Sequence, residues 1–182
     1  MKKLYIISND KIGCMKRYYT SNNDLNNIIS CLNDNYKIHL ISRKSIKKYD
    51  YLITEKLKLT DTKDIDEDKI NVLMISITPF NFLTLMKLIY LNKKIRGFVY
   101  LRSDGFLEYK IRYGIVGYYT YFLMFYIIKK YLKILTCSKN FTHVKSKKIL
   151  HPSELTANWF KKKVDKKNFK IDFLYVGRFK KE

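Results

Sequence analysis

The densest group of chemically able side chains follows an apolar, strand-like run at residues 98–101, in the stretch LRSDGFLEYKIRYG. Parallel α/β sheets bind ligands beyond the carboxyl ends of their strands, which is where these side chains would lie. Arg102 can form a fork to a phosphate or carboxylate, and Asp104 and Glu108 can orient sugar hydroxyls or act as a base. We therefore name Asp104 as the candidate catalytic residue and Arg102 and Glu108 as candidate ligand-binding residues. The alternative is that Asp104 caps a helix while the other charges pair with one another in solvent.

A second group of polar side chains follows the first apolar run, residues 4–8, in the stretch SNDKIGCMKRYY. Backbone amides beside a flexible glycine, here Gly13, can hold a phosphate or a polar acceptor with the help of two cations. Asp10, Lys16 and Arg17 are therefore candidate binding residues. The alternative is an ordinary surface loop.

Short strand-like runs alternate with helical runs along the chain, which is typical of βαβ units on a mainly parallel sheet. We expect strands at residues 4–8, 37–42, 70–76, 98–101, 134–137, 147–153 and 171–176, and a less certain one at 51–53. Ser21 resembles the start of one helix, and Thr78 can cap another whose first residue is Pro79 and which ends near residue 92. Further helices are expected at about residues 114–132 and after Ser153. The acidic stretch at residues 54–69 is expected to be a solvated loop.

The chain of 182 residues carries a formal net charge of +21, which favours an anionic partner such as nucleic acid, a phosphate or an acidic membrane. Part of this excess follows from a usage rich in Lys, Asn, Ile and Tyr, as an AT-rich coding bias produces. The three cysteines and three histidines are scattered, which argues against a disulfide framework or a zinc site and fits a reduced, cytosolic protein. The six glycines form neither GxGxxG nor a P-loop, which disfavours nicotinamide, flavin and nucleoside-triphosphatase enzymes.

One uncharged stretch, GIVGYYTYFLMFYII at residues 114–128, raises the question of a membrane. Its 15 residues fall short of the roughly 20 that a helix needs to span a bilayer. We therefore expect a buried or interfacial helix there.

Two stretches toward the end of the chain resemble a known enzyme family. FLYVGRFKKE, residues 173–182, resembles the beginning of the second domain in GT-B glycosyltransferases, in particular glycosyltransferase family 4, where a strand ends in a Gly-Arg pair. HPSEL, residues 151–155, is similar to the passage between the two Rossmann-like domains of that family. The resemblance implies that residues 1–165 form the acceptor-side domain, a Rossmann-like, mainly parallel sheet with helices on both faces. It implies that residues 166–182 form a connector and the first strand of a truncated donor-binding domain.

The resemblance also implies an activity, the transfer of a sugar from a nucleotide-sugar donor to a glycan or lipid-linked acceptor. Arg178 would then contact the diphosphate of the donor, and the candidate binding residues named above would contact the acceptor. Such transferases stabilise the leaving diphosphate with protein cations, so neither a metal nor another cofactor is expected. Because most of the family's donor pocket has no counterpart in these residues, the chain is expected to have little activity alone.

The resemblance implies a cytoplasmic protein with peripheral contact to an anionic membrane, since members of the family often dock on the cytoplasmic membrane face. The alternative function is a non-catalytic, basic α/β module that binds nucleic acid or an anionic membrane surface through its charge. Nucleic acid is the less favoured partner, because Lys and Arg are spread along the chain and no nucleic-acid motif occurs.

Overall fold

The computed structural model describes residues 2–14, 17–47, 49, 51–53, 57–138, 141, 143 and 144. The strands expected at residues 147–153 and 171–176 and the helix expected after Ser153 lie outside these residues. The predicted division of the chain into residues 1–165 and 166–182 lies outside them as well.

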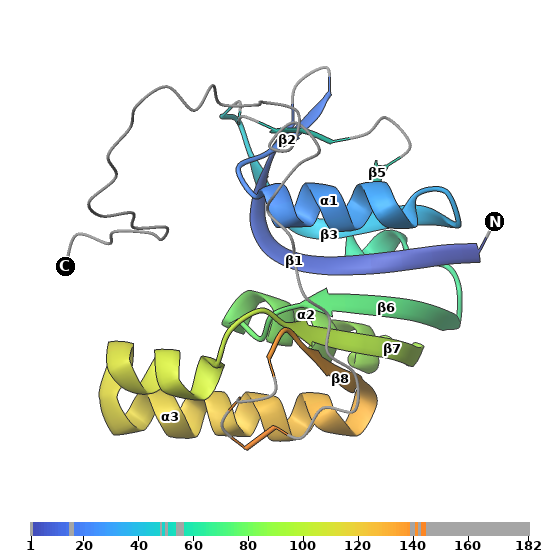
Figure 1. The fold of residues 1–182 in the computed structure, drawn as a ribbon. Helices are drawn as coiled ribbons and strands as arrows, with labels where there is room; N and C mark the ends of the chain where they lie inside the picture. The colour runs from blue at the N-terminus through green and yellow to red at the C-terminus, as the bar shows by residue number, and fades with distance from the viewer. Residues whose placement is uncertain are drawn as a thin grey trace, which may run out of the picture. The chain divides into compact units, whose positions relative to one another are not determined.

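Six parallel strands form the body of the sheet in the order β5-β3-β1-β6-β7-β8 (Figure 1). They are β1 (Lys2–Cys14), β3 (Tyr36–Ser45), β5 (Lys58–Leu59), β6 (Lys69–Ile75), β7 (Lys94–Leu101) and β8 (Lys133–Thr136). Two short antiparallel strands, β2 (Tyr18–Thr20) and β4 (Tyr51–Leu52), extend the sheet from the end of β1. The α/β class and the mainly parallel sheet expected from the sequence are thus confirmed.

Helices cover both faces of the sheet, so the side chains on both faces of β1 are buried. Leu4 and Ile6 pack in one cluster with Leu25 and Ile29 of helix α1 (Asn23–Leu32). Side chains of a strand alternate between its faces, so Tyr5 and Ile7, which each follow one of these two residues, lie in a second cluster on the other face. That second cluster contains the buried faces of α2 (Pro79–Tyr90) and α3 (Gly105–Tyr131).

Helix α3 is a hairpin of two helical arms, residues 105–113 and 115–131, which meet at Gly114 (Figure 1). Gly114 has φ 65° and ψ −151°, a conformation in which residues with a Cβ are strained. The arms pack antiparallel, since the rings of Tyr109 and Tyr121 lie 5.1 Å apart and those of Phe106 and Phe125 also 5.1 Å. The sequence predicted the second arm, and it indicated the first only through the alternative in which Asp104 caps a helix.

No helix among the described residues is long and apolar enough to span a membrane. The expectation of a buried or interfacial helix at residues 114–128 agrees with this finding, since the second arm has one buried face and one exposed face.

Two segments expected to be loops are more ordered than predicted. β1 continues past Ser8 to Cys14, with an irregularity in its pairing to β3 between Ile7 and Lys11, so the stretch expected to be a loop around Gly13 is largely strand. The acidic stretch contains β5 and a 3₁₀ turn, η1 (Thr62–Asp64), and buries Leu57 and Ile65. Both expectations were wrong because polar residues dominate these segments, while their few apolar side chains complete the two cores.

The close approach of the two arms of α3 predicts a sharp steric effect at Gly117. A Cβ there would lie 2.3 Å from the carbonyl oxygen of Tyr109, so Gly117→Ala must push the arms apart. We expect the free energy of unfolding to fall by about 1–3 kcal/mol in guanidinium titrations. Thr120→Ala, on the exposed side of the same arm, is the control and should change it by less than about 0.5 kcal/mol. Equal stabilities for the two variants would contradict the packed hairpin.

Candidate functional site

The candidate site lies at the carboxyl ends of the parallel strands, where the strand order reverses. β1 has β3 on one side and β6 on the other, and the helices that follow, α1 and α2, cover opposite faces. Such a switch point is where open α/β sheets bind ligands. The polar side chains gathered there, which we call the carboxyl-edge cluster, are Ser8, Asp10, Asn22, Asp24, Ser76 and Arg102.

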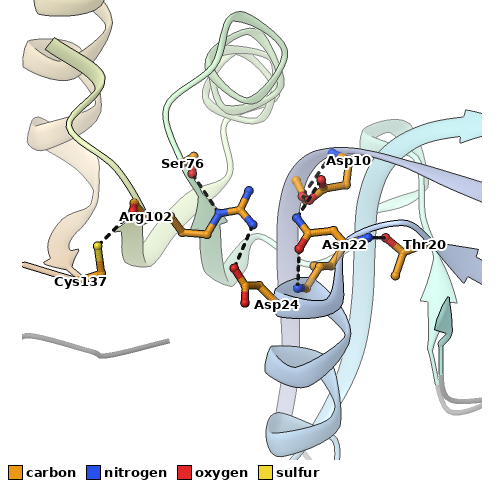
Figure 2. A network of polar contacts seen from close by, with 9 residues as sticks. Asp10, Thr20, Asn22, Asp24, Ser76, Arg102 and Cys137 are labelled. Carbon is orange, nitrogen blue, oxygen red and sulfur yellow. Dashed lines mark hydrogen bonds and ion pairs between the residues drawn. The ribbon is translucent and has the colours of Figure 1, made fainter. Parts of the chain in front are cut away.

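One half of the cluster joins β1 to the beginning of α1 (Figure 2). Ser8 Oγ donates to Asp10 Oδ2 at 2.5 Å, and Asn22 Nδ2 donates to Asp10 Oδ1 at 3.0 Å. Asn22 is also the N-cap of α1, since its Oδ1 accepts from the backbone N–H of Leu25 at 3.3 Å. The Asp10 carboxylate is therefore held in place by the residue that starts the helix.

The other half of the cluster centres on Arg102, directly after β7 (Figure 2). Its Nε donates to Ser76 Oγ at 3.5 Å, and its Nη1 lies 3.7 Å from Asp24 Oδ2. Asp24 stands in the first turn of α1, where the helix dipole favours a negative charge. Its second oxygen, Oδ1, is buried and has no hydrogen-bond partner among the described residues. The Arg102 guanidinium thus connects α1 to the turn after β6 through two long contacts.

A buried amide holds the turn that carries Ser76. Asn81 of α2 is fully buried, and its Nδ2 donates to the carbonyl oxygens of Ile75 at 2.7 Å and Ser76 at 2.9 Å. Ser76 has φ 65°, an uncommon value for a residue other than glycine. Thr78 caps α2, as the sequence predicted, by accepting from the Asn81 backbone N–H at 3.2 Å. The rigid turn therefore fixes where the Ser76 hydroxyl meets Arg102.

Two acidic groups beside the cluster stay protonated at neutral pH. Burial raises the pKa of Tyr100 to about 12, and the nearby Cys137 and Asp24 add to the effect. Burial also raises the pKa of the Cys137 thiol, whose Sγ donates to the Arg102 carbonyl oxygen at 3.0 Å. Because the thiolate is disfavoured, Cys137 supports the Arg102 backbone and is poorly suited to act as a nucleophile.

Of the binding residues predicted on β1 and β7, the structure brings Asp10 and Arg102 into the same cluster. They meet through Asn22 and Asp24 of α1, as the contacts above describe. Arg17 is exposed just before β2, and Lys16 lies outside the described residues.

Asp104 takes the capping arrangement weighed as its alternative. Its Oδ1 accepts from the backbone N–H groups of Phe106 at 3.1 Å and Leu107 at 3.3 Å, at the start of α3. Glu108 is exposed in the first turn of the same helix. Arg178 lies outside the described residues, so its predicted contact with a donor stays a prediction.

Sequence reasoning missed Asn22, Asp24, Ser76 and Asn81 as parts of the site. The sequence pattern indicates a helix start at Ser21, one residue before the observed cap Asn22, and no local signal marks Asp24 as a binding residue. α1 lies near the end of β7 only because the connections between the parallel strands bring the two together, and no local sequence pattern encodes that arrangement. No group of three or more His, Cys, Asp or Glu side chains in the described part is placed to hold a metal ion. The expected absence of a metal stays a prediction.

The capping role of Asn22 predicts a difference between two neighbouring residues. Asn22→Ala removes both the helix cap and a hydrogen bond to Asp10, so the free energy of unfolding should fall by about 1–2 kcal/mol. Ser21→Ala, at the cap position expected from sequence, should have less than half this effect in the same urea titration. A larger loss at Ser21 would contradict the cluster geometry.

The raised pKa of Tyr100 predicts a loss of stability in alkali. The unfolded chain releases the phenol proton near the ordinary pKa of 10.0, whereas the folded chain holds it to about 12. The contribution is therefore complete below the lower value and is lost as the pH rises through the higher one. Tyr100→Phe should flatten this decline in unfolding free energy, whereas Tyr119→Phe, at an exposed position, should leave it unchanged. A decline as steep in Tyr100→Phe as in the wild type would contradict the assignment.

Neither the protein-family models, nor the curated proteins, nor the solved structures gave a match.

Proposed function

We propose that the chain is the acceptor-side domain of a GT-B type glycosyltransferase, which transfers a sugar from a nucleotide sugar to a glycan or lipid-linked acceptor. The observation that carries the proposal is the carboxyl-edge cluster at the switch point of the sheet. The parallel strands, numbered along the chain, stand in the order 3-2-1-4-5-6, which is that of doubly wound nucleotide-binding folds. This order supports a Rossmann-like domain with its ligand at the carboxyl edge.

The cluster offers the groups that recognise a hydroxyl-rich ligand. Asp24 keeps 15% of its side-chain surface exposed, and its Oδ2 lies 3.7 Å from Arg102 Nη1, so this carboxylate can accept from a ligand hydroxyl beside the guanidinium. Among the described residues, the Arg102 guanidinium makes two long contacts, to Ser76 and Asp24, so it can turn toward a ligand oxygen. Asp10 is already held by Ser8 and Asn22, and it orients the start of α1.

In this proposal the contact with the acceptor falls to Asp24 and Arg102. Asp104, the catalytic candidate from sequence, lies two residues after Arg102 in the same loop. It uses one carboxylate oxygen to cap α3. A base that deprotonates an acceptor hydroxyl needs a free oxygen within hydrogen-bond reach of it. Asp24 lies beside Arg102 at the switch point of the sheet, with its Oδ2 3.7 Å from Arg102 Nη1, and it is therefore our candidate for orienting the reacting hydroxyl.

The donor side of the proposal rests on the resemblance of residues 173–182 to the start of a donor domain. Arg178 would contact the diphosphate, and protein cations would stabilise it as it leaves, without a metal. The remaining donor-site residues of that family have no counterpart in this sequence, so we expect this chain to bind acceptor without turnover. The cytoplasm, where nucleotide sugars are present, is the compartment that fits the proposal.

Acceptor binding by the chain tests the proposal directly. Saturation-transfer NMR against a panel of oligosaccharides should identify a binder, and Asp24→Asn and Arg102→Gln should each weaken it about tenfold or more. Arg96→Gln is the matched control, since Arg96 is exposed on β7, the strand that Arg102 directly follows. Melting curves confirm that the variants fold. An equal loss in Arg96→Gln, or binding of oligonucleotides and no sugar, would contradict the transferase proposal.

A further inference from the structure

The outer surface of the α3 hairpin is apolar and exposed to solvent. Six large side chains of the second arm form a continuous stripe, Ile115, Val116, Tyr119, Phe122, Leu123 and Tyr126. We call these six residues the hairpin stripe. Ile111 and Tyr113 of the first arm are exposed beside the turn at Gly114, with Ile111 76% exposed. The spacing of the stripe follows one face of a helix.

The hairpin stripe is not needed for the core. The opposite face of the same arm, with Tyr121, Phe125 and Ile128, already fills the second cluster. A helix that is apolar on all sides normally lies in a protein core or a membrane, and a large exposed apolar patch marks an interaction site. Ile115 and Val116 are 70% and 71% exposed, which is too much apolar surface at one turn to be incidental.

The hairpin projects beyond the carboxyl edge of the sheet (Figure 1). Its first arm starts four residues after β7 ends and runs outward for about 14 Å at 1.5 Å per residue. The second arm runs back for about 25 Å to the beginning of β8. The turn at Gly114 is therefore the most distant part of the hairpin, and the loop that carries Arg102 lies near its base.

Cations flank the hairpin stripe at both ends. Lys110 and Arg112 precede the turn, and Lys129 and Lys130 end the second arm, whereas Glu108 is the single acid within α3. Lys130 Nζ lies 4.9 Å from the centre of the Tyr126 ring, and Arg112 lies 6.0 Å from that of Tyr113. Apolar side chains framed by tyrosines and cations suit the boundary between headgroups and acyl chains of an anionic bilayer.

We propose that the α3 hairpin is a membrane-docking element that inserts its turn and the hairpin stripe into the surface of an anionic lipid bilayer. The hairpin lies on the membrane and does not span it. Anionic lipid is the occupant that the flanking cations favour, since an apolar protein partner would gain nothing from them. The inference does not depend on the transferase proposal. Where both hold, the carboxyl-edge cluster faces acceptors carried by a membrane lipid.

Vesicle flotation of the full chain tests the apolar part of the inference. The chain should bind vesicles of phosphatidylcholine with about 30 mol % phosphatidylglycerol and bind pure phosphatidylcholine far less. Ile115→Ser with Phe122→Ser should weaken binding at least about tenfold, because both side chains would leave the acyl boundary. Leu83→Ser with Tyr90→Ser, two exposed apolar positions on α2, is the control and should leave binding unchanged.

A second pair of variants separates the location of charge from its total. The first double variant, Lys129→Glu with Lys130→Glu, changes two exposed positions of the hairpin. The second, Lys37→Glu with Lys69→Glu, changes two exposed positions of the sheet and alters the net charge by the same amount. We expect at least about a tenfold loss of vesicle binding in the first pair and a much smaller loss in the second. Equal losses, or binding that ignores the serine variants, would overturn the inference. A dimer that the serine variants dissociate, seen by sedimentation velocity without any vesicle binding, would overturn it too.

Discussion

The parallel pairing of β1 with strands on both of its sides is the constraint on which the rest of the structure depends. Leu4 to Ile7 pair with β3, and Tyr5 to Ser8 pair with β6, so β1 has no free edge from Tyr5 to Ile7. Its side chains alternate between two apolar clusters, and a shift of one residue would exchange their contents. Register, helix placement and the position of the switch point therefore follow from one strand.

The carboxyl-edge cluster exists because the helix after β1 and the helix after β6 lie on opposite faces of the sheet. Asp24 comes from the helix on one face, whereas Arg102 and Ser76 come from the neighbouring strands β7 and β6. Their contacts are long, and Asp24 and Arg102 keep 15% and 26% of their side-chain surface exposed. Such partly solvated polar groups can exchange partners at low cost, whereas the short contacts around Asp10 act as a fixed support. The site thus combines a rigid half and an adaptable half.

The sequence was a reliable guide where a local signal and the tertiary structure agree. Thr78 and Pro79 start α2 as predicted, because capping and the fixed φ of proline act within one turn of chain. The apolar runs of β6, β7 and β8 were recognised, with ends that differ by at most four residues. These strands fixed the fold class.

The misses share a different cause, which is dependence on contacts with another helix or strand. β1 extends to Cys14 because Tyr18 and its neighbours pair back onto it. Ser76 adopts positive φ because Asn81 binds the carbonyl oxygens around it. Arg102 was identified as a binding residue, but its partner Asp24 is 78 positions earlier, and only the crossovers bring the two together.

The α3 hairpin shows how a chain with few glycines uses them. Three of the six glycines, Gly105, Gly114 and Gly117, lie in this one element. Its inner surface therefore tolerates little change, since two of them meet neighbouring atoms closely and the third makes the turn. The outward-facing residues carry no such restriction. Substitution there can alter what the hairpin contacts while its fold is kept, so this part of the molecule is free to acquire new binding preferences independently of the sheet.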